Sequence, residues 1–182
     1  MISAHSMQNV ELAFHKAIRG NLVRDTGDGC EIAAVQSGPV GKDSAHKLLL
    51  ITISSFVFRL IVIFRIIDNP ATRAYYLRAD RARTLDEVFA EVANLCSGAL
   101  NRELSVNFPH LAMSTPYTLS DECLAFLGEL RPQHVARFGI TINGSVQLQA
   151  TLCMCCSRPV EVAAASAAAD EADARIGELE LF

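Results

Sequence analysis

Five polar or small residues in the segment 84–104 have the spacing of one face of an α-helix. Glu87, Glu91, Asn94, Gly98 and Asn101 follow one another at steps of three or four residues, so they share one side of a helix. A carboxylate at position 91 and an amide at position 94 would then lie one turn apart. Because an amide can accept one hydrogen bond while it donates another, this face is the candidate site.

The opposite face of the same segment predicts a buried stripe. Its apolar residues are Leu85, Val88, Phe89, Val92, Leu95, Cys96, Ala99 and Leu104. They recur at the three- and four-residue steps of an amphipathic helix that packs on a core. Thr84 stands at the position of the N-cap with Glu87 three residues later, a pattern that predicts a capping box.

Gly98 is unusual within this helix, because glycine in a helix interior costs about 1 kcal/mol relative to alanine. A missing side chain at position 98 would let another backbone or a partner protein come close to Glu91 and Asn94. Two interpretations remain open. The face is either a docking surface, or a solvated face whose glycine is accidental or serves a tight helix crossing.

The residues Glu91-Val-Ala-Asn94, followed by Gly98 and then by Ser114-Thr115-Pro116, resemble a helix and the following strand of the CheC, CheX and FliY family of chemotaxis phosphatases. The single Glu-x-x-Asn motif is similar to the CheX arrangement, since the motif usually occurs twice in CheC. Leu95 stands where the family often has methionine. The resemblance is clearest over residues 84–120, and elsewhere it concerns the order of elements.

This resemblance implies a function and roles for the five residues. The chain is expected to hydrolyse the phosphoaspartate of a phosphorylated CheY-type response regulator, which supplies the Mg²⁺, and to bind no cofactor itself. Asn94 would position the attacking water, and Glu91 would pair with a lysine of the regulator. Glu87, Gly98 and Asn101 would contribute to docking. The alternative is a catalytically weak adaptor or regulatory module that docks on the regulator.

Composition indicates one globular domain. The chain has 182 residues, 51% of them hydrophobic and 20% charged, which suffices for a proper core. We predict a domain at 1–156 and an alanine-rich acidic tail at 157–182. The net charge of −4 and the lack of a Lys/Arg cluster argue against nucleic acid as a partner. The first 20 residues do not have the pattern of a secretory signal, so we expect a cytoplasmic protein.

Residues 48–67 form an apolar run long enough to span a bilayer. Arg59 and Arg65 would then lie in the hydrocarbon, each at a cost of roughly 2.5–3.5 kcal/mol. The abundance of Ile, Val, Phe and Thr instead favours two strands that turn near Ser54-Ser55. From Phe58 onward one parity is apolar, whereas the other contains both arginines. We therefore predict no membrane span, and a sheet whose second face is shared with a partner, in line with a homodimer.

The remaining elements complete an α+β fold. Helical spacing covers 7–25, and a short strand is expected at 31–36 before a loop at 37–47. A strand with a proline kink follows the central helix at 111–119, and a short helix capped by Ser120 ends before Pro132. Asn143-Gly144 predicts a hairpin of strands 135–142 and 145–154. The order predicts helices packed on one face of a largely antiparallel sheet, as in CheX and CheC.

Two other groups of residues are weaker candidates for binding. Tyr75 and Tyr76 lie among arginines in a connecting segment, where they would either stack on a nucleotide base or form a solvated rim. Cys153 and Cys155 should project to one side of a strand and Cys156 to the other. A metal site needs about four converging ligands, so we assign these cysteines to packing and predict no metal site.

Overall fold

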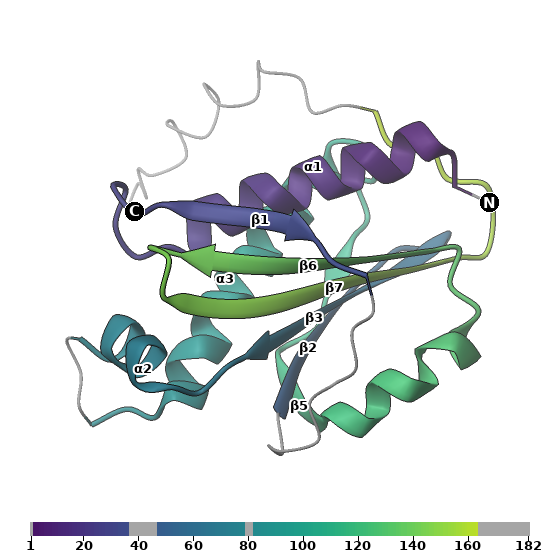
Figure 1. The fold of residues 1–182 in the computed structure, drawn as a ribbon. Coiled ribbons are helices and arrows are strands. Elements are labelled where there is room, and N and C mark those ends of the chain that lie inside the picture. Colours follow the sequence, from purple (N-terminus) through teal and green to yellow (C-terminus); the bar gives the residue numbers. More distant parts are fainter. Residues whose placement is uncertain (1, 37–46, 79–81, 164–182) are drawn as a thin grey trace, which may run out of the picture.

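The computed structural model describes residues 2–36, 47–78 and 82–163. The predicted loop at 37–47 lies outside this range except for its last residue, and so does the tail from residue 164. The described part is an α+β domain in which helices pack against a largely antiparallel open sheet (Figure 1). This confirms the predicted fold class.

The sheet has seven strands, six of them in the order β1-β6-β7-β3-β2-β4, and β5 also pairs with β2. Every pairing is antiparallel. The strands are β1 (Cys30–Ala34), β2 (Lys47–Ser54), β3 (Phe58–Ile66), β4 (Ala112–Met113), β5 (Tyr117–Ser120), β6 (His134–Ile142) and β7 (Val146–Cys156). Pro116, which cannot donate to a ladder, lies between β4 and β5, so the predicted strand 111–119 is divided into two short pieces along β2.

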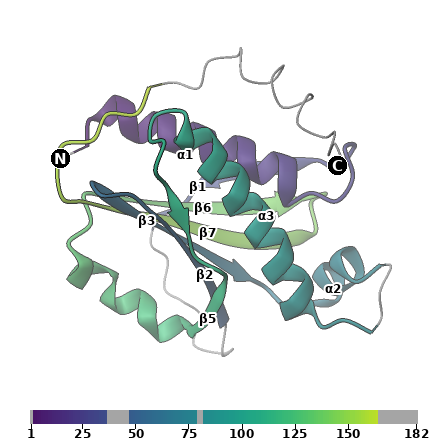
Figure 2. The ribbon, with the colours of Figure 1, turned by 180° about the vertical axis from the view of Figure 1, so that it is seen from behind.

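Two long helices, α1 (Ala4–Asn21) and α3 (Leu85–Ser105), cover one face of the sheet (Figure 2). A short helix, α2 (Pro70–Tyr76), packs beside α3. The opposite face is partly covered by the 3₁₀ helix η1 (Asp121–Leu130), whose Leu124 and Leu127 pack on Ile61 and Ile63 of β3. The alternation predicted for β3 is confirmed, because its two parities belong to two separate apolar clusters.

The apolar run at 48–67 is the β2–β3 hairpin. Ser55 closes its turn, since the Ser55 side chain accepts hydrogen bonds from the amides of Val57 and Phe58 at 3.1 Å. Among the helices of the described chain, none has the length and apolar character that a bilayer crossing requires. The β6–β7 hairpin turns at Asn143 and Gly144, whose φ angles of 50° and 67° are those that favour Asn-Gly.

Two predictions about side chains are wrong. Leu95, placed in the buried stripe, is 55% exposed, because the core side of α3 is centred on Phe89, Ala93, Cys96 and Leu100. Tyr75 and Tyr76 neither form a solvated rim nor present a stacking surface, since they are only 6% and 1% exposed. The Tyr76 hydroxyl donates to the carbonyl of Leu22 at 2.9 Å, so α2 is anchored to the end of α1.

The first residues after the domain boundary predicted at 156 pack on the first turns of α1. Val160 and Val162 are buried, and Val160 pairs with Ile2. The Asn9 amide donates to the carbonyl of Val162 at 2.7 Å, and Ser6 donates to Glu161 at 2.8 Å. We call residues 157–163 the C-terminal strap. The domain boundary itself stays a prediction.

Candidate functional site

The candidate site lies on the outer face of α3, and the start of that helix is fixed by a capping box. The Thr84 side chain accepts from the amide of Glu87 at 3.3 Å, while the Glu87 carboxylate accepts from the Thr84 amide at 2.8 Å. These hydrogen bonds from Thr84 hold the pKa of Glu87 below its usual value. The capping box confirms the prediction, and it makes Glu87 a structural residue of the helix start as well as a candidate for docking.

Glu91 and Asn94 lie one turn apart on the side of α3 that faces away from the core. The Glu91 carboxylate is 58% exposed and forms an ion pair with Arg83, with Oε2 2.9 Å from Nη2. Asn94 is partly exposed, and no other described residue occupies its side-chain amide. The amide is therefore available for a water molecule or an approaching group. Both side chains point away from the core, as the candidate chemistry requires.

Gly98 leaves an open position beside these two residues. A Cβ atom built at Gly98 would meet Arg102 Nη1 at 3.9 Å as its nearest neighbour outside the local helix backbone. The interpretation of Gly98 as a tight helix crossing is therefore wrong, because no described backbone or core side chain fills the space above it. Because no side chain projects at position 98, a second protein could approach the helix backbone closely on its exposed side.

Asn101 is less open than the other members of the row. Its side-chain Oδ1 is shielded from solvent and has no hydrogen-bond partner among the described residues, and the Ser97 hydroxyl is in the same situation. An approaching donor would have to reach Oδ1 after a change of side-chain rotamer. The docking role of Asn101 stays a prediction.

The strand that follows α3 in sequence returns to its first turns. Pro116 and Thr118 line a cavity of about 100 Å³ together with Asp86, Phe89 and Ala90. The structure thus brings Pro116 close to the first turns of the helix that carries the motif. Sequence spacing alone does not predict this contact, because β5 lies near α3 only as a result of its pairing with β2.

Sequence reasoning missed two arginines at this site. Arg83 pairs with Glu91 although it precedes the N-cap, and Arg102 extends toward Gly98. A signal for Arg102 was available, since it lies four residues after Gly98 on the same helix. No comparable signal exists for Arg83, because the conformation of the chain before the helix decides where it points. Within the described residues no group of three His, Cys, Asp or Glu side chains is placed to hold a metal ion.

Comparison with known proteins gives a match in structure without a match in sequence. No protein-family model matches the chain, and no curated protein sequence is significantly similar to it. Similar solved structures include the CheX-CheY-BeF3-Mg²⁺ complex from Borrelia burgdorferi (10% identity, 82% of this chain and 97% of that chain, TM-score 0.53). They also include a CheC-like superfamily protein from Shewanella sp. PV-4 (7% identity, 84% and 98%, TM-score 0.51) and the chemotaxis protein CheX from Desulfovibrio desulfuricans (15% identity, 80% and 98%, TM-score 0.51). The fold of the chain is that of CheX and CheC-like chemotaxis proteins.

Proposed function

We propose that this chain is a CheX-like phosphatase that hydrolyses the phosphoaspartate of a CheY-type response regulator in chemotaxis or two-component signalling. The observation that carries the proposal is the pair Glu91 and Asn94, exposed one turn apart on α3 of a CheX-like fold. The Borrelia protein with the same fold was solved as a complex with CheY, BeF3 and Mg²⁺. By analogy the outer face of α3 would meet the regulator.

The proposed reaction requires little covalent chemistry from this chain. A water oxygen attacks the phosphorus, the bond from phosphorus to the aspartate oxygen breaks, and inorganic phosphate and a free carboxylate result. The regulator would hold the phosphoryl group and the Mg²⁺ that neutralises it. The helper protein must place a water molecule in line with the leaving oxygen. The Asn94 amide suits this task, because its oxygen accepts from the water while its nitrogen donates to a phosphoryl oxygen.

The other residues of the face would bring the two proteins together. Glu91 would exchange its Arg83 partner for a lysine of the regulator, and the open position at Gly98 would let the surfaces close. Exposed Leu95, next to Asn94, would add an apolar contact. We further propose that the protein acts in the cytoplasm and forms a homodimer.

The test is the rate of phosphate release from an acyl-phosphorylated regulator in the presence of the purified chain. Asn94→Ala should lower the catalysed rate roughly 100- to 1,000-fold, the usual cost of one preorganised polar group at a reacting centre. Docking, measured by titration of the unphosphorylated regulator, should persist. Unchanged turnover with folded Asn94→Ala would reject the role of Asn94.

One observation favours the alternative of a catalytically weak adaptor. Glu91 is already neutralised by Arg83, whereas an enzyme poised for docking would gain from a free carboxylate. The adaptor hypothesis predicts that the chain binds the regulator and leaves its rate of dephosphorylation unchanged. The same assay therefore separates the two functions.

A further inference from the structure

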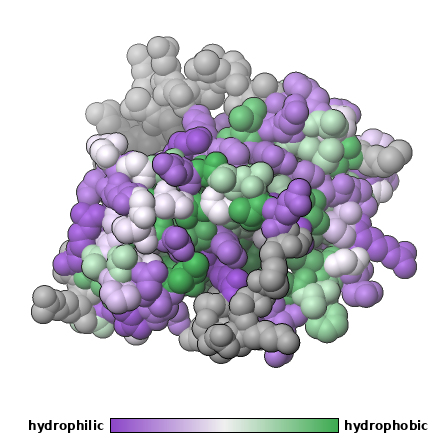
Figure 3. Space-filling model, in the orientation of Figure 1, coloured by the Kyte–Doolittle hydropathy of each residue, from purple (hydrophilic) through white to green (hydrophobic). Residues whose placement is uncertain are grey.

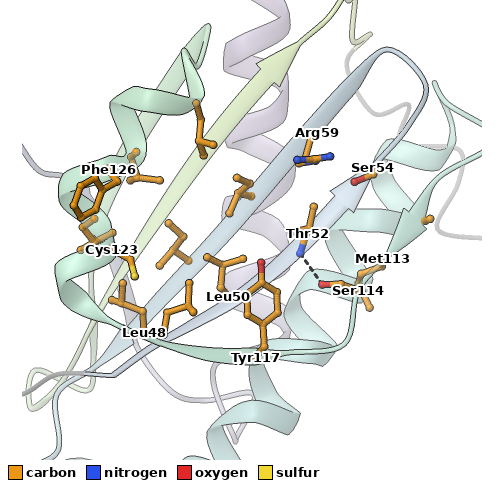
Figure 4. A pocket seen from close by; sticks show the side chains of 17 residues that line it. Leu48, Leu50, Thr52, Ser54, Arg59, Met113, Ser114, Tyr117, Cys123 and Phe126 are labelled. Carbon is orange, nitrogen blue, oxygen red and sulfur yellow. Dashed lines mark hydrogen bonds between the residues drawn. The ribbon is translucent and has the colours of Figure 1, made fainter.

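A second concave site lies on the face of the sheet opposite α1 and α3. It is a cavity of about 730 Å³ between strands β2 and β3, the β4–β5 segment and η1 (Figure 4). This volume falls within the range of about 300–1,000 Å³ that is typical of small-molecule sites. Green apolar surface shows in the middle of this face and at its lower right, where Figure 1 places η1 (Figure 3).

The wall of the cavity is mostly aliphatic. Its apolar side chains include Leu48, Leu50, Ile61, Ile63, Leu124 and Leu127. The hairpin β2–β3 supplies the floor and η1 supplies one side, so secondary structure holds both surfaces in place. Phe126 of η1 also lines the cavity and is 65% exposed, which indicates that this end opens to solvent.

Polar groups gather at the other end. Arg59 and its cross-strand neighbour Ser54 lie together, far from Phe126 and Cys123 (Figure 4). Ser114 accepts a hydrogen bond from the Thr52 amide at 3.0 Å, which leaves the Ser114 hydroxyl proton free to be donated. Arg59 is exposed, and no described residue pairs with its guanidinium. It is the one charged residue in the described lining of the cavity.

The two arginines of β3 on this face differ in whether a carboxylate lies near the guanidinium. Arg65 is buried, and its guanidinium lies 3.6 Å from the Asp121 carboxylate and 3.3 Å from the Gln149 side chain. Arg59 has the same orientation on the strand but is not met by any carboxylate of the described chain. A guanidinium beside an aliphatic cavity is complementary to an anionic head on an apolar body.

We propose that this cavity binds a linear aliphatic carboxylate of the fatty acid class. The carboxylate accepts hydrogen bonds from Arg59 and from the hydroxyls of Ser54 and Ser114. The hydrocarbon chain lies along Leu50 and Ile61 toward η1. This site is separate from the outer face of α3 and does not depend on the function proposed for that face.

The experiment is calorimetric titration of the full chain with dodecanoate below its micellar concentration. We expect saturable binding of one molecule per chain. Arg59→Gln should weaken binding roughly 10- to 100-fold, because a charge-assisted hydrogen bond contributes about 1.5–3 kcal/mol. Arg19 is an exposed residue of α1. Arg19→Gln makes the same charge change on the opposite side of the sheet and should leave binding unaltered. Dodecanol, which lacks the carboxylate, should bind the wild type and Arg59→Gln equally.

Three outcomes would overturn this proposal. They are absence of saturable binding, equal affinity of the wild type and folded Arg59→Gln for dodecanoate, and a stable dimer in sedimentation that dodecanoate neither enters nor dissociates. The third outcome would assign the cavity to a second copy of this chain. Phosphate release from the regulator should be the same for the wild type and Arg59→Gln, so failure at this cavity leaves the proposed function standing.

Discussion

Arg83 and Glu91 form an ion pair across the first turns of α3, with 2.9 Å between Nη2 and Oε2. The side chains of Arg83 and Glu91 are 41% and 58% exposed, so solvent screens the pair and it contributes about 0–1 kcal/mol. A regulator lysine that uses Glu91 must displace Arg83. We predict that Arg83→Gln strengthens docking of the regulator up to about fivefold and leaves kcat unchanged.

The measurement for Arg83→Gln is a titration of phosphate release against regulator concentration. Arg73→Gln is a matched control, since Arg73 of α2 is an exposed arginine that pairs with Asp68. Weaker docking with Arg83→Gln, and unchanged docking with Arg73→Gln, would show that Arg83 itself contacts the regulator.

Gly98 offers a way to separate stability from docking. Because a Cβ atom at this position meets nothing closer than 3.9 Å, Gly98→Ala should raise the free energy of unfolding by about 0.5–1 kcal/mol. Urea denaturation measures this change. Gly98→Trp should fold equally well yet lose most of its affinity for the regulator, because the indole fills the open position. Full affinity in Gly98→Trp would exclude Gly98 from the interface.

Asp28 should make stability depend on pH in the acid range. Its carboxylate accepts hydrogen bonds from the Tyr75 hydroxyl and, at 2.6 Å, from the Asn143 amide, and these lower its pKa to about 2. A carboxyl group with a lowered pKa stabilises the fold above its ordinary pKa and loses that contribution as pH falls toward the folded value. The difference in Tm between wild type and Asp28→Asn should therefore shrink between about pH 5 and pH 2.

Tyr75→Phe provides the companion measurement for Asp28. It removes the donor that contributes most to the lowered pKa of Asp28, so the Tm difference between Tyr75→Phe and wild type should also diminish with acidification. A difference that stays constant over this pH range in both variants would contradict the assignment.

The C-terminal strap should contribute to the stability of the fold. Val162 is 4% exposed and its backbone amide donates to Ser6 at 2.9 Å. Val162→Ala should cost on the order of 1–3 kcal/mol, as expected for a truncated core side chain. A chain that ends at Ala163 keeps the whole strap and serves as the reference. A chain that ends at Ser157 should melt at a clearly lower temperature, and equal melting of the two would refute the role of the strap.

Periodicity and residue type predicted most strands of the sheet, but not their order or the division of the strand 111–119. The alternation along β3 and β7 predicted the two faces correctly, and Cys153 and Cys156 lie in different apolar clusters as expected. The same reasoning failed for Leu95. Whether a residue at the edge of an apolar stripe is buried depends on which other elements pack against it, and periodicity does not predict this. It failed for Tyr75 and Tyr76 because the burial of α2 depends on the end of α1, which is distant in sequence.

The candidate site was predicted in part. Spacing placed Glu91 and Asn94 together, since both belong to one helix. The ion pair with Arg83 and the approach of Pro116 depend on tertiary structure and have no local signature. The cavity near Arg59 was also missed. The floor of this cavity belongs to the predicted second face of the sheet. The position of η1 above that floor does not follow from the hydrophobic pattern of η1 or of the β2–β3 hairpin.

The division of the outer strand at Pro116 bears on the tendency of this chain to aggregate. β2 is rich in leucine and isoleucine. If its outer edge were unpaired, a strand from another molecule could pair with it. The short pieces β4 and β5 occupy that edge but are interrupted between Met113 and Tyr117, so they present no long regular ladder in turn. If residues 114–116 continued the strand without interruption, we would expect fibrils to grow more readily from concentrated solutions.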